Sequence, residues 1–344
     1  MKYLTKEKNI INSLIFISCI FYFSGTVSTQ SSDTLNNSDV NEHFSIKWIS
    51  QFSSSKDLKN SNKLSHRIFN FLFGSGDRAL VRPTSMISLA NNKWIIVDQG
   101  NNNLMYLHSE EGDFYSLSQT VLPSPIAVCA SSSNDIYFTD SYLNKIFKGK
   151  VDDKQYEVLN DSLMLKRPTG IAFLPQRREI WVVETMAHQI TVMNPGGKVL
   201  RRYGKRGTSP GEFNFPTFLW IDAQGRIYIV DSMNFRVQIM NPEGEIISFF
   251  GEAGDATGYF SRPKGIATDT RGNIYVVDAL FHTVQIFNQK GQFLSNFGKQ
   301  GREPGQFWLP VGIYIDEDDR IYVSDSYNSR IQVFQLIQGV LNEN

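Results

Sequence analysis

The chain has 344 residues, of which 41% are hydrophobic and 13% aromatic, and this is ample apolar material for a folded core. Lys and Arg together number 34, as do Asp and Glu, so the net charge provides no attraction to nucleic acid or to an anionic membrane. We therefore expect no nucleic-acid partner. A chain of this length often forms two domains, but the internal repeat described below favours one closed domain.

The first 29 residues have the layout of a secretory signal peptide. Lys2, Lys6 and Lys8 precede an apolar run at residues 10–23, and small residues follow at positions 24–28. The run is short for a membrane-spanning helix. We expect a cleaved signal, with an uncleaved N-terminal anchor as the alternative. The protein is then exported, to be periplasmic, extracellular or associated with the cell envelope, and has no membrane span after cleavage.

Two N-terminal segments have the character of strands. Residues 30–43 are rich in Ser, Asn and Asp and predict a polar linker. Residues 45–52 alternate between apolar and polar and predict a strand, whereas residues 64–73 have apolar positions at helical spacing. Within the latter segment, residues 67–74, RIFNFLFG, also resemble a strand.

Residues 225–240, GRIYIVDSMNFRVQIM, contain the unit that the chain repeats. A β-branched and aromatic run predicts a strand, an acidic residue ends it, and a short turn leads into a second strand. Six acids recur 42 to 47 residues apart, and a proline precedes each by 15 or 16 residues. The acids are Asp98, Asp140, Glu184, Asp231, Asp278 and Asp325, and the prolines are Pro83, Pro125, Pro168, Pro216, Pro263 and Pro310.

This period is typical of a β-propeller blade, and we predict an all-β fold, a six-bladed β-propeller of four-stranded blades. No fourth strand follows Phe334, so the ring must be closed by an N-terminal strand. We favour residues 45–52 for this strand, with residues 67–74 as the alternative. The propeller then spans residues 44–337, and residues 338–344 form a C-terminal tail.

Residues 305–334, GQFWLPVGIYIDEDDRIYVSDSYNSRIQVF, resemble an NHL repeat. The pattern of that family is G-x-F-x-x-P-x-G-I-A-V-D followed by I-Y-V-x-D-x-x-N-x-R-I-Q-V-F. Copies four to six match it closely and copies one to three loosely, over about residues 82–334. The resemblance is to exported bacterial-type NHL repeat proteins. It implies the propeller fold and indicates little about activity, because propellers have many unrelated functions.

The six repeated acids have two possible roles. Carboxylates pointing together into the channel would need a cation, since unpaired buried charges are costly. An acid at a strand end before a turn usually accepts backbone N–H bonds instead. We favour this structural role.

His188 and His282 each follow the acid by four residues, in copies three and five. The peptide-amidating lyases are propellers of a similar kind and bind zinc through histidines near the channel. That resemblance makes His188 and His282 weak candidate ligands for Zn or Ca at the channel mouth. A catalytic zinc needs about three protein ligands, and no equivalent loop supplies a third histidine. We therefore expect no metal and no cofactor, with Zn or Ca as the alternative.

The second residue after the acid is large and apolar or aromatic in five copies, although turn positions are usually polar or Gly. In a propeller these turns emerge on one face, near the channel mouth. The candidate binding residues are Tyr142, Met186, Met233, Leu280 and Tyr327, with Phe235 beside them and His188, His282, Arg236 and Arg330 as a polar rim. Packing between neighbouring turns is the alternative interpretation.

We accordingly expect a non-catalytic scaffold that binds a protein or an extracellular polymer through its loop face. The chain has no Gly-x-Ser-x-Gly motif, and Cys129, in an apolar stretch, reads as a core residue. The alternative is a metal-dependent propeller lyase or hydrolase, similar to the peptide-amidating lyases or to lactonases, with His188 and His282 at the channel mouth.

Overall fold

The computed structural model describes residues 44–58, 79–90, 92–117, 121–151, 156–159, 161 and 163–338. The expected leader and linker, the helix at 64–73 and the alternative closing strand at 67–74 lie outside the described residues. Within the described part, no helix has the length and apolar character needed to cross a membrane.

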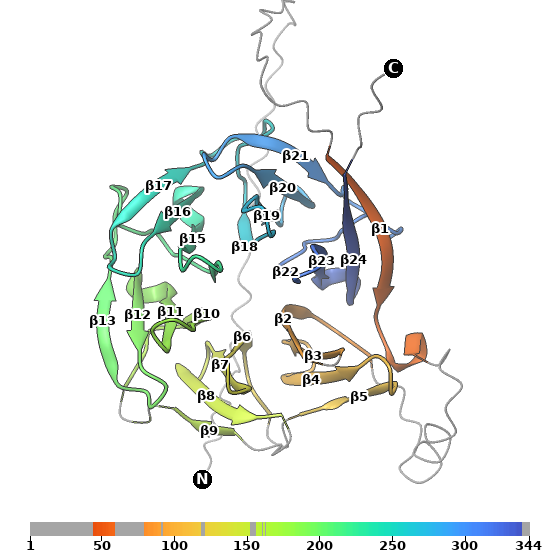
Figure 1. The fold of residues 1–344 in the computed structure, drawn as a ribbon, viewed down its shortest axis with the longest axis horizontal. Helices are drawn as coiled ribbons and strands as arrows, with labels where there is room; N and C mark the ends of the chain where they lie inside the picture. Colours follow the sequence, from red (N-terminus) through yellow and green to blue (C-terminus); the bar gives the residue numbers. More distant parts are fainter. Residues whose placement is uncertain are drawn as a thin grey trace, which may run out of the picture. The chain divides into compact units, whose positions relative to one another are not determined.

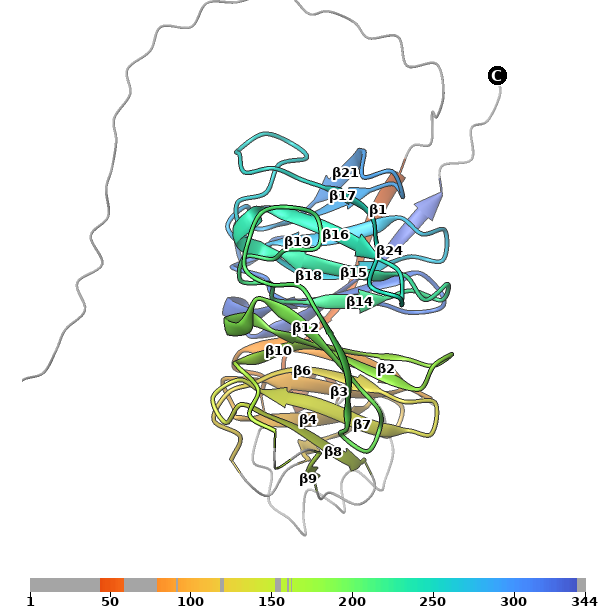
Figure 2. The same ribbon diagram turned by 90° about the vertical axis from the view of Figure 1, so that its left-hand side faces the viewer.

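In the described part of the chain, six four-stranded antiparallel sheets stand around a common axis as the blades of a propeller (Figure 1), and Figure 2 shows the ring from its side. The first three blades are β2 (Pro83–Leu89), β3 (Lys93–Asp98), β4 (Asn103–His108) and β5 (Asp113–Ser116); β6 (Pro125–Ala130), β7 (Asp135–Asp140), β8 (Lys145–Lys150) and β9 (Tyr156–Val158); and β10 (Pro168–Leu174), β11 (Glu179–Glu184), β12 (Gln189–Met193) and β13 (Val199–Tyr203). The last three are β14 (Leu219–Ile221), β15 (Ile227–Asp231), β16 (Arg236–Met240) and β17 (Ile246–Phe250); β18 (Pro263–Thr268), β19 (Ile274–Asp278), β20 (Thr283–Phe287) and β21 (Phe293–Phe297); and β22 (Ile313–Ile315), β23 (Arg320–Asp325), β24 (Arg330–Gln338) and β1 (Phe44–Phe52). Single 3-10 turns are η1 (Ser55–Leu58), η2 (Thr185–Ala187), η3 (Ser232–Asn234) and η4 (Ser326–Asn328).

The N-terminal strand closes the ring, as predicted. β1 pairs antiparallel with β24, from Phe44 opposite Gln338 to Phe52 opposite Ile331, and Figure 1 shows the two strands side by side. The indole N–H of Trp48 donates to the side-chain oxygen of Gln332 over 3.0 Å. The sixth blade thus takes its outer strand from the start of the propeller, and the edge of β24 is covered.

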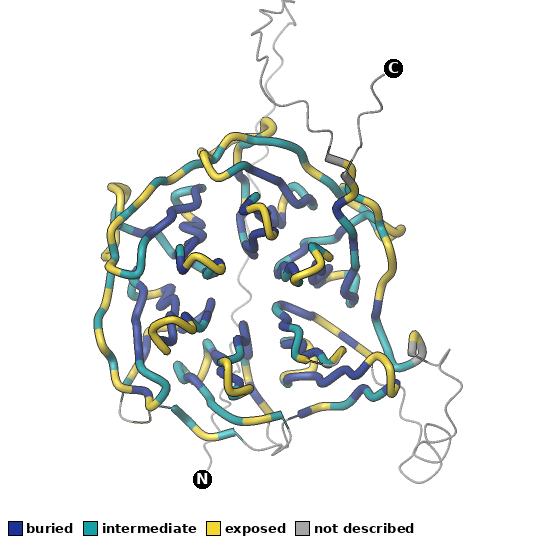
Figure 3. Tube along the Cα trace, in the orientation of Figure 1, coloured by how far each residue is buried: buried dark blue, intermediate teal, exposed yellow. Residues whose placement is uncertain are grey.

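The core lies between blades. The buried apolar side chains of the described residues form six clusters, and each cluster joins two neighbouring blades. Every residue of β15 and β16 is buried, because both faces of their sheet are covered. In Figure 3 the inner strands are mostly buried, and exposed residues gather at turns and along the outer strands. Opening the ring would expose one face of each of two blades, so closure and core formation are the same event.

Candidate functional site

The repeated acids hold the turns of the blades together. All six are buried, with at most 2% of their surface exposed. The carboxylate of Asp98 accepts the N–H groups of Val81 and Arg82, each over 2.8 Å, and also those of Gly100 and Asn101. Asp278 likewise accepts the N–H of Arg262. The predicted structural role of the acids is confirmed, because each of the six carboxylates accepts at least one backbone N–H.

The fourth residue after each acid has a left-handed backbone, with φ between 52° and 58° in all six blades. The residues are Asn102, Asn144, His188, Phe235, His282 and Ser329. Asn and His are among the non-glycine residues that adopt this conformation most readily. The position therefore ends the turn between the second and third strands, and its occupant is restricted by backbone geometry.

His188 and His282 link neighbouring blades. The imidazole Nδ1 of His188 accepts the backbone N–H of Phe215 over 3.1 Å, and that of His282 accepts the N–H of Leu309 over 3.1 Å. The side-chain oxygen of Asn144 makes the same bond to Arg167 over 2.8 Å. The pKa of His188 is lowered, mainly by burial and also by the nearby positive charge of Arg206. The lowered pKa favours the neutral ring, and only a neutral ring can accept a hydrogen bond at Nδ1.

A neutral imidazole whose Nδ1 accepts a hydrogen bond carries its proton on Nε2, so in this arrangement neither nitrogen of His188 or His282 has a free lone pair for a metal. Among the described residues, the group of three able to surround a metal ion is His108, Glu111 and Asp113, at the turn between β4 and β5. It contains neither of the two histidines singled out in the sequence. We attach no function to this group, because one histidine beside surface carboxylates is a common arrangement.

Five apolar side chains of the equivalent turns are exposed, and we call them the turn ring. The exposed fractions are 74% for Tyr142, 50% for Met186, 52% for Met233, 48% for Leu280 and 56% for Tyr327. None of the five belongs to the six buried clusters between the blades. The guanidinium of Arg82 lies 5.4 Å from the ring centre of Tyr327, a cation–π contact between the last blade and the first.

Arg236 and Arg330 do not lie on an exposed rim. Both are buried, and each pairs with the acid five residues earlier, Arg236 with Asp231 over 2.9 Å and Arg330 with Asp325 over 2.8 Å. A buried guanidinium requires a counter-charge and acceptors, and these residues find both inside the blade. Phe235 is half-buried and packs against the core between blades four and five. These three residues therefore stabilise the turns.

A cavity of about 530 Å³, which we call the mouth cavity, opens at the start of the innermost strands. It is lined by the residues that flank each repeated proline and by those that follow each acid. Met233 and Tyr327 of the turn ring line it, whereas Tyr142, Met186 and Leu280 lie outside its lining. The turn ring thus contributes two side chains to the mouth cavity and three to the surrounding face.

Four cations and no carboxylate line the mouth cavity among the described residues. The cations are Arg82, Arg167, Arg262 and Lys264. The three arginines directly precede the repeated prolines of blades one, three and five, so they approach the axis from alternate blades. Sequence reasoning missed this feature, although the signal was present as Arg-Pro in three of the six copies.

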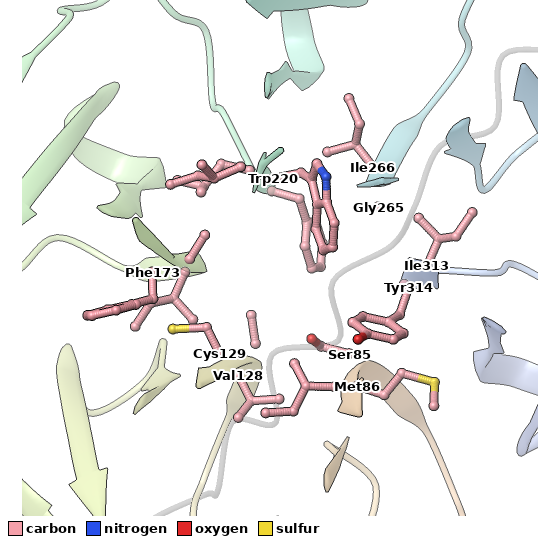
Figure 4. Close-up of a pocket in the computed structure, with 18 of the residues that line it drawn as sticks. Ser85, Met86, Val128, Cys129, Phe173, Trp220, Gly265, Ile266, Ile313 and Tyr314 are labelled. Carbon is pink, nitrogen blue, oxygen red and sulfur yellow. The ribbon is translucent and has the colours of Figure 1, made fainter. Parts of the chain in front are cut away.

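A second cavity of about 230 Å³ lies further along the channel, between the innermost strands. Phe218 lines both cavities. Figure 4 shows Trp220 of β14 and Tyr314 of β22 projecting from different blades, and their ring centres are 6.1 Å apart. The thiol of Cys129 is buried beside this cavity, and burial raises its pKa, as expected for an unreactive core cysteine.

Comparison with known proteins identifies the repeat and the fold. Residues 307–334 match the family described as NHL repeat, and residues 158–241 match the family described as 6-bladed beta-propeller. The resemblance and the fold class predicted from the sequence are confirmed. No curated protein matches the chain in sequence.

Many solved structures share the fold at low sequence identity. Virginiamycin B lyase from Staphylococcus aureus is 15% identical, with a TM-score of 0.58 over 86% of this chain and 100% of its own. An auxiliary nutrient binding protein from Bacteroides thetaiotaomicron is 13% identical, with a TM-score of 0.62 over 75% of this chain and 69% of its own. A chain of a nidogen/laminin complex is 17% identical, with a TM-score of 0.55 over 73% of this chain and 90% of its own. At these identities the likeness shows the fold alone.

Proposed function

We propose that this chain, an NHL-repeat six-bladed β-propeller, is a non-catalytic scaffold that binds a protein or an extracellular polymer through the face that carries its turn ring. Export, expected from the first 29 residues, is part of the same proposal. A lyase, a nutrient binding protein and a nidogen/laminin complex all share the fold, so the choice depends on the site of this chain.

The observation that carries the proposal is the exposure of five large apolar side chains at equivalent turns. Water-exposed apolar surface gains roughly 25 cal/mol per Å² on being covered. A side chain such as Tyr142, 74% exposed, contributes little to folding and can contribute to docking. The turn ring surrounds the mouth cavity, so one partner can cover both.

The alternative, a metal-dependent lyase or hydrolase, has less support. It requires His188 and His282 as ligands, and the Nδ1 atom of each accepts a backbone N–H from the next blade. A catalytic zinc also requires about three protein ligands with an open position. Metal analysis of the purified propeller is the direct check, and near-stoichiometric zinc or calcium would favour the enzyme.

The docking proposal is tested with the double variant Tyr142→Ala, Leu280→Ala. Neither residue lines the mouth cavity, and 74% of Tyr142 and 48% of Leu280 are exposed, so the melting temperature should stay within about 2 °C of wild type. Retention of envelope or extracellular material by the immobilised protein should be lost. Ile247→Ala, on the outer strand β17 and 55% exposed, is the matched control and should retain it. A variant that melts much lower than wild type while retaining its partner would contradict the proposal.

A further inference from the structure

The backbones of the three arginines that line the mouth cavity are held by hydrogen bonds. The N–H groups of Arg82 and Arg262 bond to the carboxylates of Asp98 and Asp278, over 2.8 Å and 3.0 Å, and the N–H of Arg167 bonds to Asn144. Each arginine also precedes a proline, which restricts its backbone. Three guanidinium groups therefore start from fixed points around one axis, and such preorganisation favours ligand binding.

Lys264, the second residue of β18, is half-buried in the same cavity. Burial, followed by the nearby Arg262 and Arg167, lowers the pKa of its ammonium group to about 8. No carboxylate of the described residues offsets these effects. Like charges gathered without a counter-charge are unfavourable, and an anion placed among them would relieve this repulsion.

The remaining polar groups of the mouth cavity are largely engaged between blades. The hydroxyl of Thr84 donates to the carbonyl of Ile126 over 2.8 Å, and that of Thr169 donates to the carbonyl of Thr217 over 2.7 Å. The hydroxyl of Ser232 donates to the carbonyl of Pro263 over 3.1 Å. These hydrogen bonds link the innermost strands of neighbouring blades. The four cations are then the main polar groups of the mouth cavity that can bind a ligand.

Apolar side chains line the mouth cavity between its charges. Blades four and six place Phe215 and Leu309 before their prolines, where blades one, three and five place arginines, and Met233 lies beside them. A ligand that fits this lining carries several negative groups around an apolar or uncharged body, because the cations come from alternate blades and the apolar side chains lie between them.

From this geometry we infer that the mouth cavity is an anion-binding site for a ligand that carries two or more carboxylate or phosphate groups. Guanidinium groups bind such oxyanions through paired hydrogen bonds, and three of them converge here together with one ammonium. The groups are supplied either by a small organic polyanion or by an acidic segment of the docked partner. The inference rests on and deepens the proposed function, since it concerns the centre of the same face.

The experiment is calorimetric titration of the whole protein at low salt with citrate, with tripolyphosphate and with a short polyglutamate peptide. We expect saturable binding that weakens by about tenfold or more in Lys264→Met and in Arg262→Gln. Arg271→Gln, an exposed arginine of the turn between β18 and β19, removes the same charge elsewhere and should bind as wild type does. Lys264→Met should melt no lower than wild type, because it removes an unbalanced charge.

Binding of citrate or tripolyphosphate supports a small polyanion, and binding of the peptide alone supports an acidic segment of a partner. The inference is overturned if no probe binds, or if the cavity variants bind as tightly as Arg271→Gln. The double variant Tyr142→Ala, Leu280→Ala separates this result from the docking proposal. It should bind the anion normally, because neither residue lines the cavity.

Discussion

Replacing Asp325 with asparagine should unfold the closing blade more readily than any change in its exposed charges. Asp325 is fully buried and accepts the N–H of Trp308 over 2.8 Å and the side-chain N–H of Arg330 over 2.8 Å. Asparagine keeps the shape but removes the charge. Arg330 would then remain buried without a counter-charge, with its other donors on the carbonyls of Glu303 and Gln306 and on the side-chain oxygen of Gln51. Breaking one partner of such a pair costs about 3–5 kcal/mol.

Urea unfolding followed by tryptophan fluorescence measures this change, and for a chain of this size it corresponds to a melting temperature lower by roughly 10 °C. Asp318→Asn is the matched control, because Asp318 pairs with Arg320 at the surface and should change stability by about 0.5 kcal/mol or less. Adding Arg330→Gln to Asp325→Asn should recover part of the loss. The reasoning is refuted if Asp325→Asn alone lies within about 1 kcal/mol of wild type. The hydrogen bonds, and not the charge, would then hold the turn.

Three further changes test the closure, the packing and the histidines of the ring. Phe52→Ala should lower the free energy of unfolding in urea by about 3 kcal/mol, because the buried Phe52 packs on Phe114 with ring centres 5.0 Å apart. Ile49→Ala, in the same strand but 46% exposed, should change this free energy little. An equal effect of the two would contradict the packing of Phe52 against the first blade. Gly265→Ala should cost about 1–3 kcal/mol, because the added Cβ would lie 2.6 Å from the backbone oxygen of Val311. Calorimetric melting measures this loss. Gly196→Ala is the control, because the nearest atom to its added Cβ lies 3.4 Å away. The pKa of His188 is lowered in the folded protein, so the unfolded chain binds the proton more readily, and stability should fall as the pH drops below about 6.5. His188→Asn keeps a side-chain hydrogen-bond acceptor and a residue that adopts the left-handed backbone readily. This variant should lose less folding stability than wild type between pH 7 and pH 5. An unchanged loss of stability would assign the pH effect to other groups.

Local sequence patterns were sufficient for the architecture. The alternation of apolar residues, the proline before each first strand and the acid after each second strand are all encoded within one repeat. Because the first five blades each fold from consecutive segments, their strands and turns follow from nearest-neighbour geometry. The same reasoning predicted that the closing strand comes from residues 45–52, since the last repeat lacks a fourth strand and an uncovered edge is unfavourable.

The direction and surroundings of polar side chains were decided by the tertiary structure. In the sequence Arg236 reads as part of a turn and thus as a surface residue, but the β-hairpin pairs it directly with Asp231, and both are buried between blades. His188 reads as a possible ligand, but its partner is the backbone of Phe215, 27 residues later in the next blade. Burial between blades is a long-range property that a turn sequence does not encode.

The candidate site shows the same division. The five apolar residues of the turn ring were identified from the sequence, because their position relative to the acid is local. The basic mouth cavity was not, because Arg82, Arg167 and Arg262 lie about ninety residues apart and meet only when the ring closes. The sequence by itself determined how many blades there are and what each turn carries. Closure of the ring decided which side chains face the axis, since it is the rotation from one blade to the next that brings distant residues to one point.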